Sequence, residues 1–289
     1  MSTIEKDSVT GTATTGHEWD GIKELNNPLP RWWLWVLLAT VAWSIGYWVV
    51  YPAWPVPGLG TTRGAIGYSS RVDHENELKA AKSLQAGMLT KIAAATPEQI
   101  AADPEMRAFA LAGGRSAFQL YCSQCHGTGA AGAAGYPNLN DDDWIWGGKL
   151  DEIYRTLRYG VRWPNDDTRM SDMPAFLADG VLKPNQIDDV ADYVLGLSGQ
   201  KADAQAAERG KTVFAENCAA CHGETGKGNL EVGAPNLTDG IWLYGGDRNA
   251  IIASVRYSRK GVMPAWEGKL DAATIKTLAV YVHALGGGK

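Results

Sequence analysis

The chain is 289 residues long, with 20% charged side chains and a formal net charge of −5 at pH 7. A length of this order corresponds to about two domains. Neither residues 107–200 nor residues 201–289 carry the basic excess of a nucleic-acid-binding domain, so that class of protein is excluded on composition.

An uncharged stretch, residues 32–51, lies near the N-terminus. A helix of this length spans about 30 Å, the thickness of the hydrocarbon core of a bilayer. Tryptophans and tyrosines gather at both of its ends, where amphipathic rings suit the membrane interface. A cleaved signal peptide is the alternative, but its apolar region usually has only about 7–15 residues after a short basic start. We therefore expect an uncleaved transmembrane anchor at residues 32–51, preceded by a cytoplasmic segment at residues 1–31.

Residues 52–105 form the expected spacer between the anchor and the rest of the chain. Three early prolines cannot continue a helix and give a semi-rigid exit from the membrane. Residues 72–95 are rich in Ala, Leu, Lys and Glu and predict a helix. Thr96, followed by proline and then Gln99, predicts a capping box, and Asp103 before another proline repeats the device.

Two copies of the pattern C-x-x-C-H account for all 4 cysteines of the chain. This pattern is the attachment signature of a c-type haem. Two thiols at this spacing reach the two vinyl groups of one porphyrin, and the adjacent histidine approaches the iron. The pattern predicts two covalently bound haem c groups, held by Cys122, Cys125 and His126 in the first copy and by Cys218, Cys221 and His222 in the second.

Zinc sites and disulfides are the alternatives for paired cysteines. The two pairs of a zinc ribbon usually lie about 15–20 residues apart, whereas 92 residues separate Cys125 from Cys218. Disulfide frameworks normally show wider and more varied spacings than i, i+3. The histidine directly after each pair favours haem.

The haem motifs lie in two copies of one sequence unit, residues 106–200 and 201–289, which we expect to be two domains. A pair of mid-helix glycines recurs, and so do the final amphipathic helices, with apolar stripes over residues 187–197 and 275–285. A close crossing of each glycine-bearing helix with a terminal helix would offset the cost of glycine, about 1 kcal/mol. The matched positions include Gly114 and Gly210, Pro137-Asn-Leu139 and Pro235-Asn-Leu237, Trp144 and Trp242, Arg158 and Arg256, and Tyr193 and Tyr281, with about eight extra residues in the first copy near 161–168.

The sixth iron ligands are predicted to be methionines. Met173 and Met263 share the context Met-Pro-Ala-aromatic, and the proline stiffens the loop that presents the sulfur. Met170 is a rival of Met173 outside the repeated tetrapeptide. Which methionine serves which haem stays open, because two similar domains related by a pseudo-twofold axis can exchange these loops. The remaining histidines, at positions 17, 74 and 283, are poorly placed or better explained as surface or packing residues.

Four further repeated side chains are candidates to contact haem propionates through charge-assisted hydrogen bonds. Structural packing explains them nearly as well. They are Arg158, Arg256, Trp144 and Trp242. His/Met ligation fills both axial positions, raises the reduction potential and suits outer-sphere electron transfer. The sequence shows no convincing catalytic centre.

Together these features resemble the dihaem subunit, subunit III, of cbb3-type cytochrome c oxidases. The resemblance implies an all-α fold, with an N-terminal transmembrane helix followed by two tandem class I cytochrome c domains. The anchor region makes it specific, through His17-Glu-Trp-Asp-Gly-Ile22, Asn27-Pro-Leu-Pro-Arg-Trp-Trp33, Trp43-Ser-Ile-Gly-Tyr47 and Tyr51-Pro-Ala-Trp-Pro55.

The resemblance also implies partners and a location. This chain would accept electrons from donor cytochrome c and pass them, through a monohaem cytochrome c subunit, towards an oxygen-reducing subunit that holds b-type haems and copper. The complex reduces oxygen and pumps protons in the bacterial inner membrane. Lys23 and Arg31 weakly favour an inside N-terminus, and attachment of c-type haem on the exported side places everything after the single span in the periplasm.

Two other functions remain open at this level. One is a stand-alone, membrane-anchored dihaem electron carrier with the same haem chemistry. The other is a dihaem peroxidase-like enzyme, which would need a vacant or labile axial position and is disfavoured by a methionine in each repeat.

Overall fold

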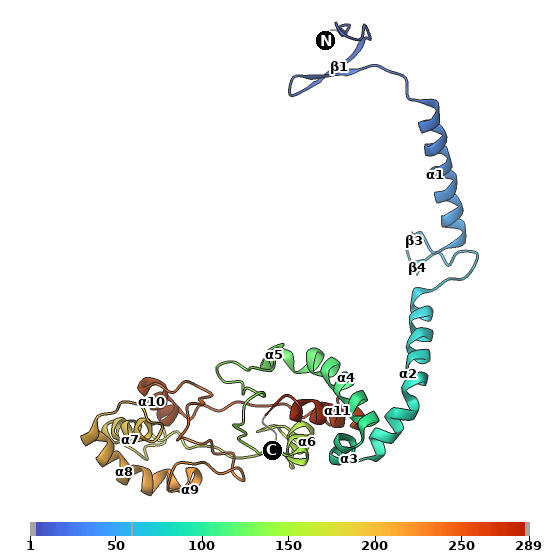
Figure 1. The fold of residues 1–289 in the computed structure, drawn as a ribbon. Coiled ribbons are helices and arrows are strands. Elements are labelled where there is room, and N and C mark those ends of the chain that lie inside the picture. The colour runs from blue at the N-terminus through green and yellow to red at the C-terminus, as the bar shows by residue number, and fades with distance from the viewer. Residues whose placement is uncertain (1–3, 59, 287–289) are drawn as a thin grey trace. The chain divides into compact units, whose positions relative to one another are not determined.

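The computed structural model describes residues 4–58 and 60–286 (Figure 1). The chain divides into two compact units, Met1–Lys82 and Ser83–Lys289. The described residues are mostly helical, with only two small two-stranded sheets. The predicted all-α architecture with one N-terminal apolar helix is therefore confirmed.

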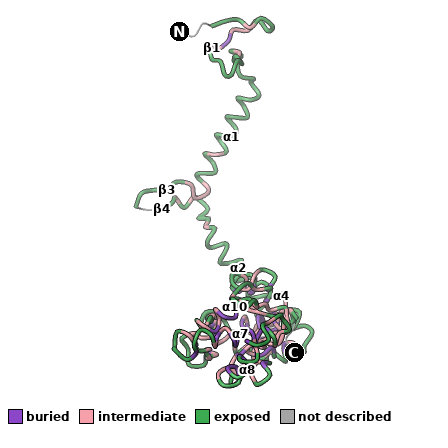
Figure 2. The backbone as a smooth tube through the Cα atoms, turned by 90° about the vertical axis from the view of Figure 1, so that its left-hand side faces the viewer, coloured by how far each residue is buried: buried purple, intermediate pink, exposed green. Residues whose placement is uncertain are grey.

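The first unit holds the apolar helix α1, Arg31–Val50, in which no residue is buried (Figure 2). Among the described residues it is the one helix that is long and apolar enough to cross a membrane. After it comes a short ribbon of β3, Pro55–Val56, and β4, Gly60–Thr61.

An antiparallel hairpin precedes α1 and was not predicted. It consists of β1, Thr14–Trp19, and β2, Ile22–Leu25. Its turn residues Asp20 and Gly21 both have positive φ, 48° and 84°. Asp-Gly between two strands is the usual sequence of a type I′ turn, and this was the signal available in the sequence.

Three helices follow, and the starts of the second and third agree with the predicted caps. They are α2, Ser70–Ala94, α3, Pro97–Ala102, and α4, Pro104–Tyr121. At α3 the Gln99 backbone N–H donates to Thr96 Oγ1 at 3.3 Å, and the Thr96 N–H donates to Gln99 Oε1 at 2.9 Å. At α4 the Met106 N–H donates to Asp103 Oδ1 at 2.8 Å. These bonds satisfy amide groups that a helix start leaves without partners.

The rest of the second unit repeats one series of helices. The first repeat continues with α5, Ser123–His126, α6, Leu150–Tyr159, and α7, Pro184–Leu197; the second consists of α8, Ala204–Asn217, α9, Ala219–His222, α10, Arg248–Tyr257, and α11, Ala272–His283.

The two repeats exchange their terminal helices. Helix α7 packs against α8 and α10, whereas α11 packs against α4 and α6 (Figure 1). We call α3–α6 with α11 lobe 1, and α7–α10 lobe 2. Each lobe therefore contains helices from both sides of residue 200, although the sequence repeat changes over at that position.

Each lobe has its own apolar core. In lobe 1 this core includes Phe118, Ile153, Leu157, Ile275, Leu278 and Val282. In lobe 2 it includes Val190, Val194, Phe214, Ile251, Ile252 and Val255. A third cluster packs the end of α2 onto lobe 1 through Ile92, Ile100, Ala110, Ala273 and Val280.

The predicted crossing at the mid-helix glycines is present. A Cβ on Gly114 would lie 2.5 Å from the Thr277 carbonyl oxygen and 2.5 Å from Tyr281 Cβ on α11. A Cβ on Gly210 would lie 2.1 Å from the Asp189 carbonyl oxygen on α7. Only glycine allows each pair of backbones to approach this closely, and each glycine meets the terminal helix of the other repeat.

We predict that Gly114→Ala destabilises the protein and that Gly113→Ala does not. The new methyl group of Gly114→Ala must push α11 away, at a cost of about 1–3 kcal/mol. A Cβ on the neighbouring Gly113 meets nothing within 4 Å, so that variant should be neutral or more stable by up to about 1 kcal/mol, as for alanine in any exposed helix. Thermal unfolding of the two haem-loaded variants measures the difference. Equal effects would contradict the close crossing.

Candidate haem-binding sites

The end of α4 and the short helix α5 form the first C-x-x-C-H site. Cys122 caps the end of α4 and is 7% exposed, and the single turn of α5 carries Cys125 to the surface. Gly127 then ends the turn with a φ of +79°. In lobe 2, α8 and α9 repeat this arrangement around Cys218 and Cys221.

The first thiol of each motif is not suited to redox exchange. Burial and, to a smaller extent, nearby Cys125 raise the pKa of Cys122 to about 11. The same causes raise the pKa of Cys218 to about 11. Disulfide-exchanging C-x-x-C sites instead lower the pKa of their nucleophile, because the thiolate is the reactive form. The electrostatics therefore disfavour a dithiol enzyme and are compatible with thioether attachment.

Both motif histidines are oriented through Nδ1. His126 Nδ1 lies 3.0 Å from the Pro137 carbonyl oxygen, and His222 Nδ1 lies 3.0 Å from that of Pro235. Burial lowers the pKa of both imidazoles, which favours the neutral form. A neutral imidazole that donates from Nδ1 leaves Nε2 as a metal ligand. The repeated Pro-Asn-Leu tripeptide was visible in the sequence, but its role as the acceptor was not.

The structure brings each Met-Pro-Ala loop to the lobe of the other repeat. Met263 packs against the lobe 1 core that contains Cys122. Met173 packs against the lobe 2 core, as Cys218 does. The rival Met170 is 64% exposed and belongs to none of the core clusters formed by the described residues.

Backbone hydrogen bonds fasten these loops in the exchanged positions. In lobe 1, Val161 and Met263 exchange two N–H···O bonds, each 3.0 Å long. In lobe 2, the Ser258 hydroxyl donates to the Met173 carbonyl oxygen. The residue after each Met-Pro-Ala also bonds across in the same way: Trp266 N–H to the Leu157 carbonyl oxygen at 3.0 Å, and Phe176 N–H to that of Val255 at 3.1 Å.

Three buried donors have no hydrogen-bond partner within the described part of the chain: Trp144 Nε1, Arg169 Nε and Arg256 Nε. Buried polar groups are rarely left unpaired, so these atoms fit a protein that holds an acidic group, such as a haem propionate, beside its core. Trp144 and Arg256 were sequence candidates for this contact. Arg158 instead forms an ion pair with Glu267. Trp242 lies against Gly246.

Arg169 was missed by sequence reasoning. It corresponds to Arg259 at the offset of 90 residues that relates Met173 to Met263, which was the available signal. Each of these arginines lies over an aromatic ring, Trp146 in one case and Tyr244 in the other. Burial lowers the pKa of Arg169, and Arg155 lowers it further.

Comparison with known families gives two matches that together cover most of the chain. The family model described as cytochrome c oxidase, cbb3-type, subunit III matches residues 109–194 and 205–282. The model described as the N-terminal domain of cytochrome oxidase-cbb3, FixP, matches residues 11–57.

Full-length relatives agree with these matches. The chain is 56% identical over 289 residues to the cbb3-type cytochrome c oxidase subunit FixP of Bradyrhizobium sp. (strain ORS 278), covering 99% of this chain and 98% of the relative. It is 51% identical over 296 residues to the cbb3-type cytochrome c oxidase subunit CcoP of Azospirillum brasilense, covering 100% of both chains.

We predict that Gly160→Ala displaces the Met263 loop in addition to straining the backbone at residue 160. Gly160 has a φ of +73°, and a Cβ there would lie 2.3 Å from the Met263 carbonyl oxygen. Gly180 is the control for a positive φ, since its φ is +69° and a Cβ there meets nothing within 4 Å.

The control variant Gly180→Ala should cost about 1–2 kcal/mol from the left-handed conformation. Gly160→Ala should cost about 1–3 kcal/mol more, from the clash and from a ψ of −172° that residues with a side chain rarely adopt, and the amide of Met263 should exchange its hydrogen faster. Thermal unfolding and hydrogen exchange measure both effects. A Met263 amide equally protected in the two variants would contradict the contact.

Proposed function

We propose that this chain, which belongs to the subunit III family of cbb3-type cytochrome c oxidases, relays electrons through two covalently bound c-type haems towards the oxygen-reducing subunit of its complex. Family membership makes the chain a membrane-anchored, haem c-binding electron-transfer subunit of a respiratory oxidase. The observation that carries the finer proposal is that each lobe combines one C-x-x-C-H motif with one Met-Pro-Ala loop in a single apolar core.

The proposed ligand sets are mixed between the repeats. In lobe 1, Cys122 and Cys125 hold the first haem, His126 is the proximal ligand and Met263 is the sixth ligand. In lobe 2, Cys218 and Cys221 hold the second haem, with His222 and Met173 as axial ligands. The loop contacts support this exchanged assignment, because the backbone of each methionine is hydrogen-bonded to a residue of the lobe that it would serve.

When bound, each haem supplies an iron that cycles between the ferrous and ferric states. The protein groups then have distinct tasks. The Nδ1–H···O bonds to Pro137 and Pro235 fix the plane and tautomer of the imidazoles. The apolar cores exclude water, and a thioether ligand raises the reduction potential. The buried donors of Trp144, Arg169 and Arg256 are available to the propionates.

With both axial positions filled, the chain has no site for a substrate at iron, so its task is transfer rather than catalysis. We place the N-terminal segment in the cytoplasm and both lobes in the periplasm of a bacterial inner membrane. The proposed partners are the catalytic haem b/copper subunit, a monohaem cytochrome c subunit and a donor cytochrome c. Residues 106–200 and 201–289 remain the proposed repeat units, each contributing to both lobes.

We predict that the two methionines act on opposite haems. In a chain with Cys122→Ala and Cys125→Ala only the second haem is attached. There, Met173→Ala should abolish the long-wavelength charge-transfer band of methionine-ligated ferric haem, and Met263→Ala should leave it. The converse chain, with Cys218→Ala and Cys221→Ala, should show the converse dependence. The opposite pattern in both chains would establish ligation within each repeat.

We predict that purification from membranes in mild detergent recovers this chain with a subunit that contains b-type haem and copper. Optical spectra and metal analysis of the purified complex measure this. Recovery of the intact dihaem chain alone would instead favour a stand-alone carrier. Rapid binding of carbon monoxide to the reduced chain, with high-spin ferric signals, would contradict filled axial positions and favour a peroxidase-like enzyme.

A further inference from the structure

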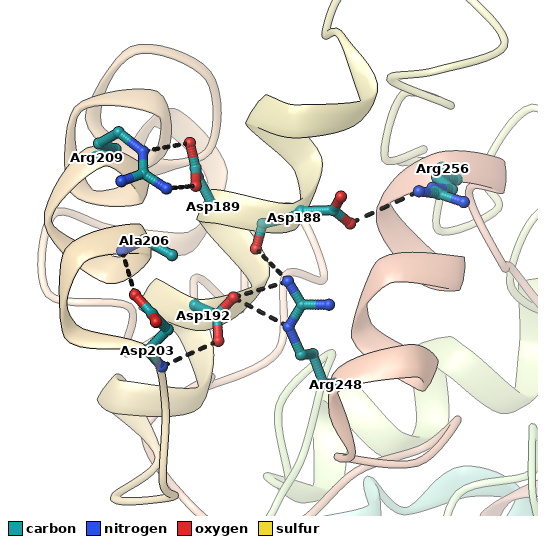
Figure 3. A network of polar contacts seen from close by, with 8 residues as sticks. All are labelled: Asp188, Asp189, Asp192, Asp203, Ala206, Arg209, Arg248 and Arg256. Atoms are coloured by element: carbon teal, nitrogen blue, oxygen red, sulfur yellow. Dashed lines mark hydrogen bonds and ion pairs between the residues drawn. The ribbon is translucent and has the colours of Figure 1, made fainter.

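Two buried carboxylates on α7 hold this helix against α8 and α10, the other two long helices of lobe 2 (Figure 3). Asp189 accepts hydrogen bonds from Arg209 of α8, at 3.0 Å from Nε and 2.6 Å from Nη2. Asp192 accepts from Arg248 of α10, at 3.0 Å from Nε and 2.8 Å from Nη2. The side chains of Asp189 and Asp192 are 12% and 5% exposed, whereas those of Arg209 and Arg248 are 61% and 44% exposed. The acidic ends are thus desolvated, and the basic ends remain partly in water.

Lobe 1 has uncharged residues at all four equivalent positions. On α11 the residues that match Asp189 and Asp192 are Thr277 and Val280, which are 3% and 2% exposed. The Thr277 hydroxyl is satisfied within its own helix by the Thr274 carbonyl oxygen at 2.8 Å. The residues that match Arg209 and Arg248 are Gly113 and Leu150. The helix and its receiving lobe therefore changed together between the repeats.

A third position differs in the sign of its charge. Asp188 on α7 lies 3.6 Å from Arg256 of α10 (Figure 3). Its counterpart on α11 is Lys276, whose Nζ donates to the carbonyl oxygens of Ala93 and Ala95 at 2.6 and 2.7 Å. The end of α2 carries the partial negative charge of a helix C-terminus, so a lysine suits this contact and an aspartate does not.

These differences penalise the unexchanged arrangement. If α7 packed on lobe 1, Asp189 and Asp192 would be buried opposite Gly113 and Leu150, without the two arginines that pair with them in lobe 2. Burying an unpaired carboxylate is strongly unfavourable. If α11 packed on lobe 2, Lys276 would approach Arg256. The apolar stripes of α7 and α11 are alike and cannot distinguish the lobes, whereas the charges can.

We propose that Asp189 and Asp192 are positioning residues that direct α7, and with it the Met173 loop, to lobe 2. The consequence at iron rests on the exchanged ligation proposed above. The pairing of α7 with α8 and α10 does not depend on that ligation, so it can be measured independently of the haem spectrum.

The first test gives α7 the residues of α11, with Asp189→Thr and Asp192→Val in the full-length, haem-loaded chain. Amide hydrogens of α7 should exchange about threefold to tenfold faster, because the two partly exposed ion pairs that tie α7 to α8 and α10 are lost. Up to about half of the methionine charge-transfer band should disappear, since one of the two haems is affected. Unchanged α7 protection would overturn the proposal.

The second test transplants the charges into lobe 1. Thr277→Asp with Val280→Asp buries two carboxylates opposite Gly113 and Leu150, and α11 should lose protection by about tenfold or more. Adding Gly113→Arg and Leu150→Arg supplies the cations of lobe 2 and should restore protection to within about threefold. Failure of the added arginines to restore protection would overturn the proposal, because a role in packing alone predicts no rescue.

Glu105→Gln is the matched control. Glu105 forms an exposed ion pair with Lys91, 3.6 Å apart, with side chains 72% and 61% exposed, and its loss should change neither measurement. A normal hydrogen-exchange pattern together with no methionine band in the unmodified protein would refute the proposed ligation. The role of Asp189 and Asp192 would then still be decided by α7 protection.

Discussion

The exchange of terminal helices is the constraint on which the rest of the second unit depends. A cytochrome-like lobe needs its final helix to cross a glycine of its first helix, and here Gly114 meets α11 while Gly210 meets α7. The chain between α7 and α8 is only residues 198–203. A connection this short favours an antiparallel helix pair, because closing it costs little entropy. Once α7 is committed to α8, the lobe of α4 can be closed only by α11.

This arrangement separates the unit of sequence from the unit of packing. Residues 106–200 and 201–289 are the repeats, yet neither contains a complete core, because each core takes its final helix and its methionine loop from the other repeat. Loosening α7 or α11 therefore disturbs the core of the lobe that carries the C-x-x-C-H motif of the other repeat. For the proposed relay this would be useful, since the two proposed haem sites are held in one framework and cannot separate as independent domains would.

Much of the architecture could be predicted from the sequence, because many of its features are determined by residues that are neighbours in the chain. The C-x-x-C-H motifs, the apolar span and the helix caps each depend on residues close together in the chain. The pairing of lobes was not readable, because α7 and α11 carry the same apolar stripe and each faces an equivalent glycine. Arg169 escaped notice for a related reason: its unpaired Nε is a property of burial, which sequence spacing does not report. The Asp-Gly hairpin before α1 was readable and was overlooked.

The charges that differ between the lobes are better explained by specificity than by stability. The guanidinium groups of Arg209 and Arg248 remain partly exposed, and ion pairs of this kind contribute only about 0–1 kcal/mol at a protein surface. Thr277 and Val280 close the equivalent interface of lobe 1 without any charge, so the fold itself does not need one. What the carboxylates add is a large penalty for the wrong lobe, where they would be buried without partners. Lys276 also distinguishes the two lobes. It occupies on α11 the position of Asp188 on α7, and it binds carbonyl oxygens at the end of α2. A gene duplication leaves two interchangeable helices, and a few charged residues on one helix are enough to make them distinct.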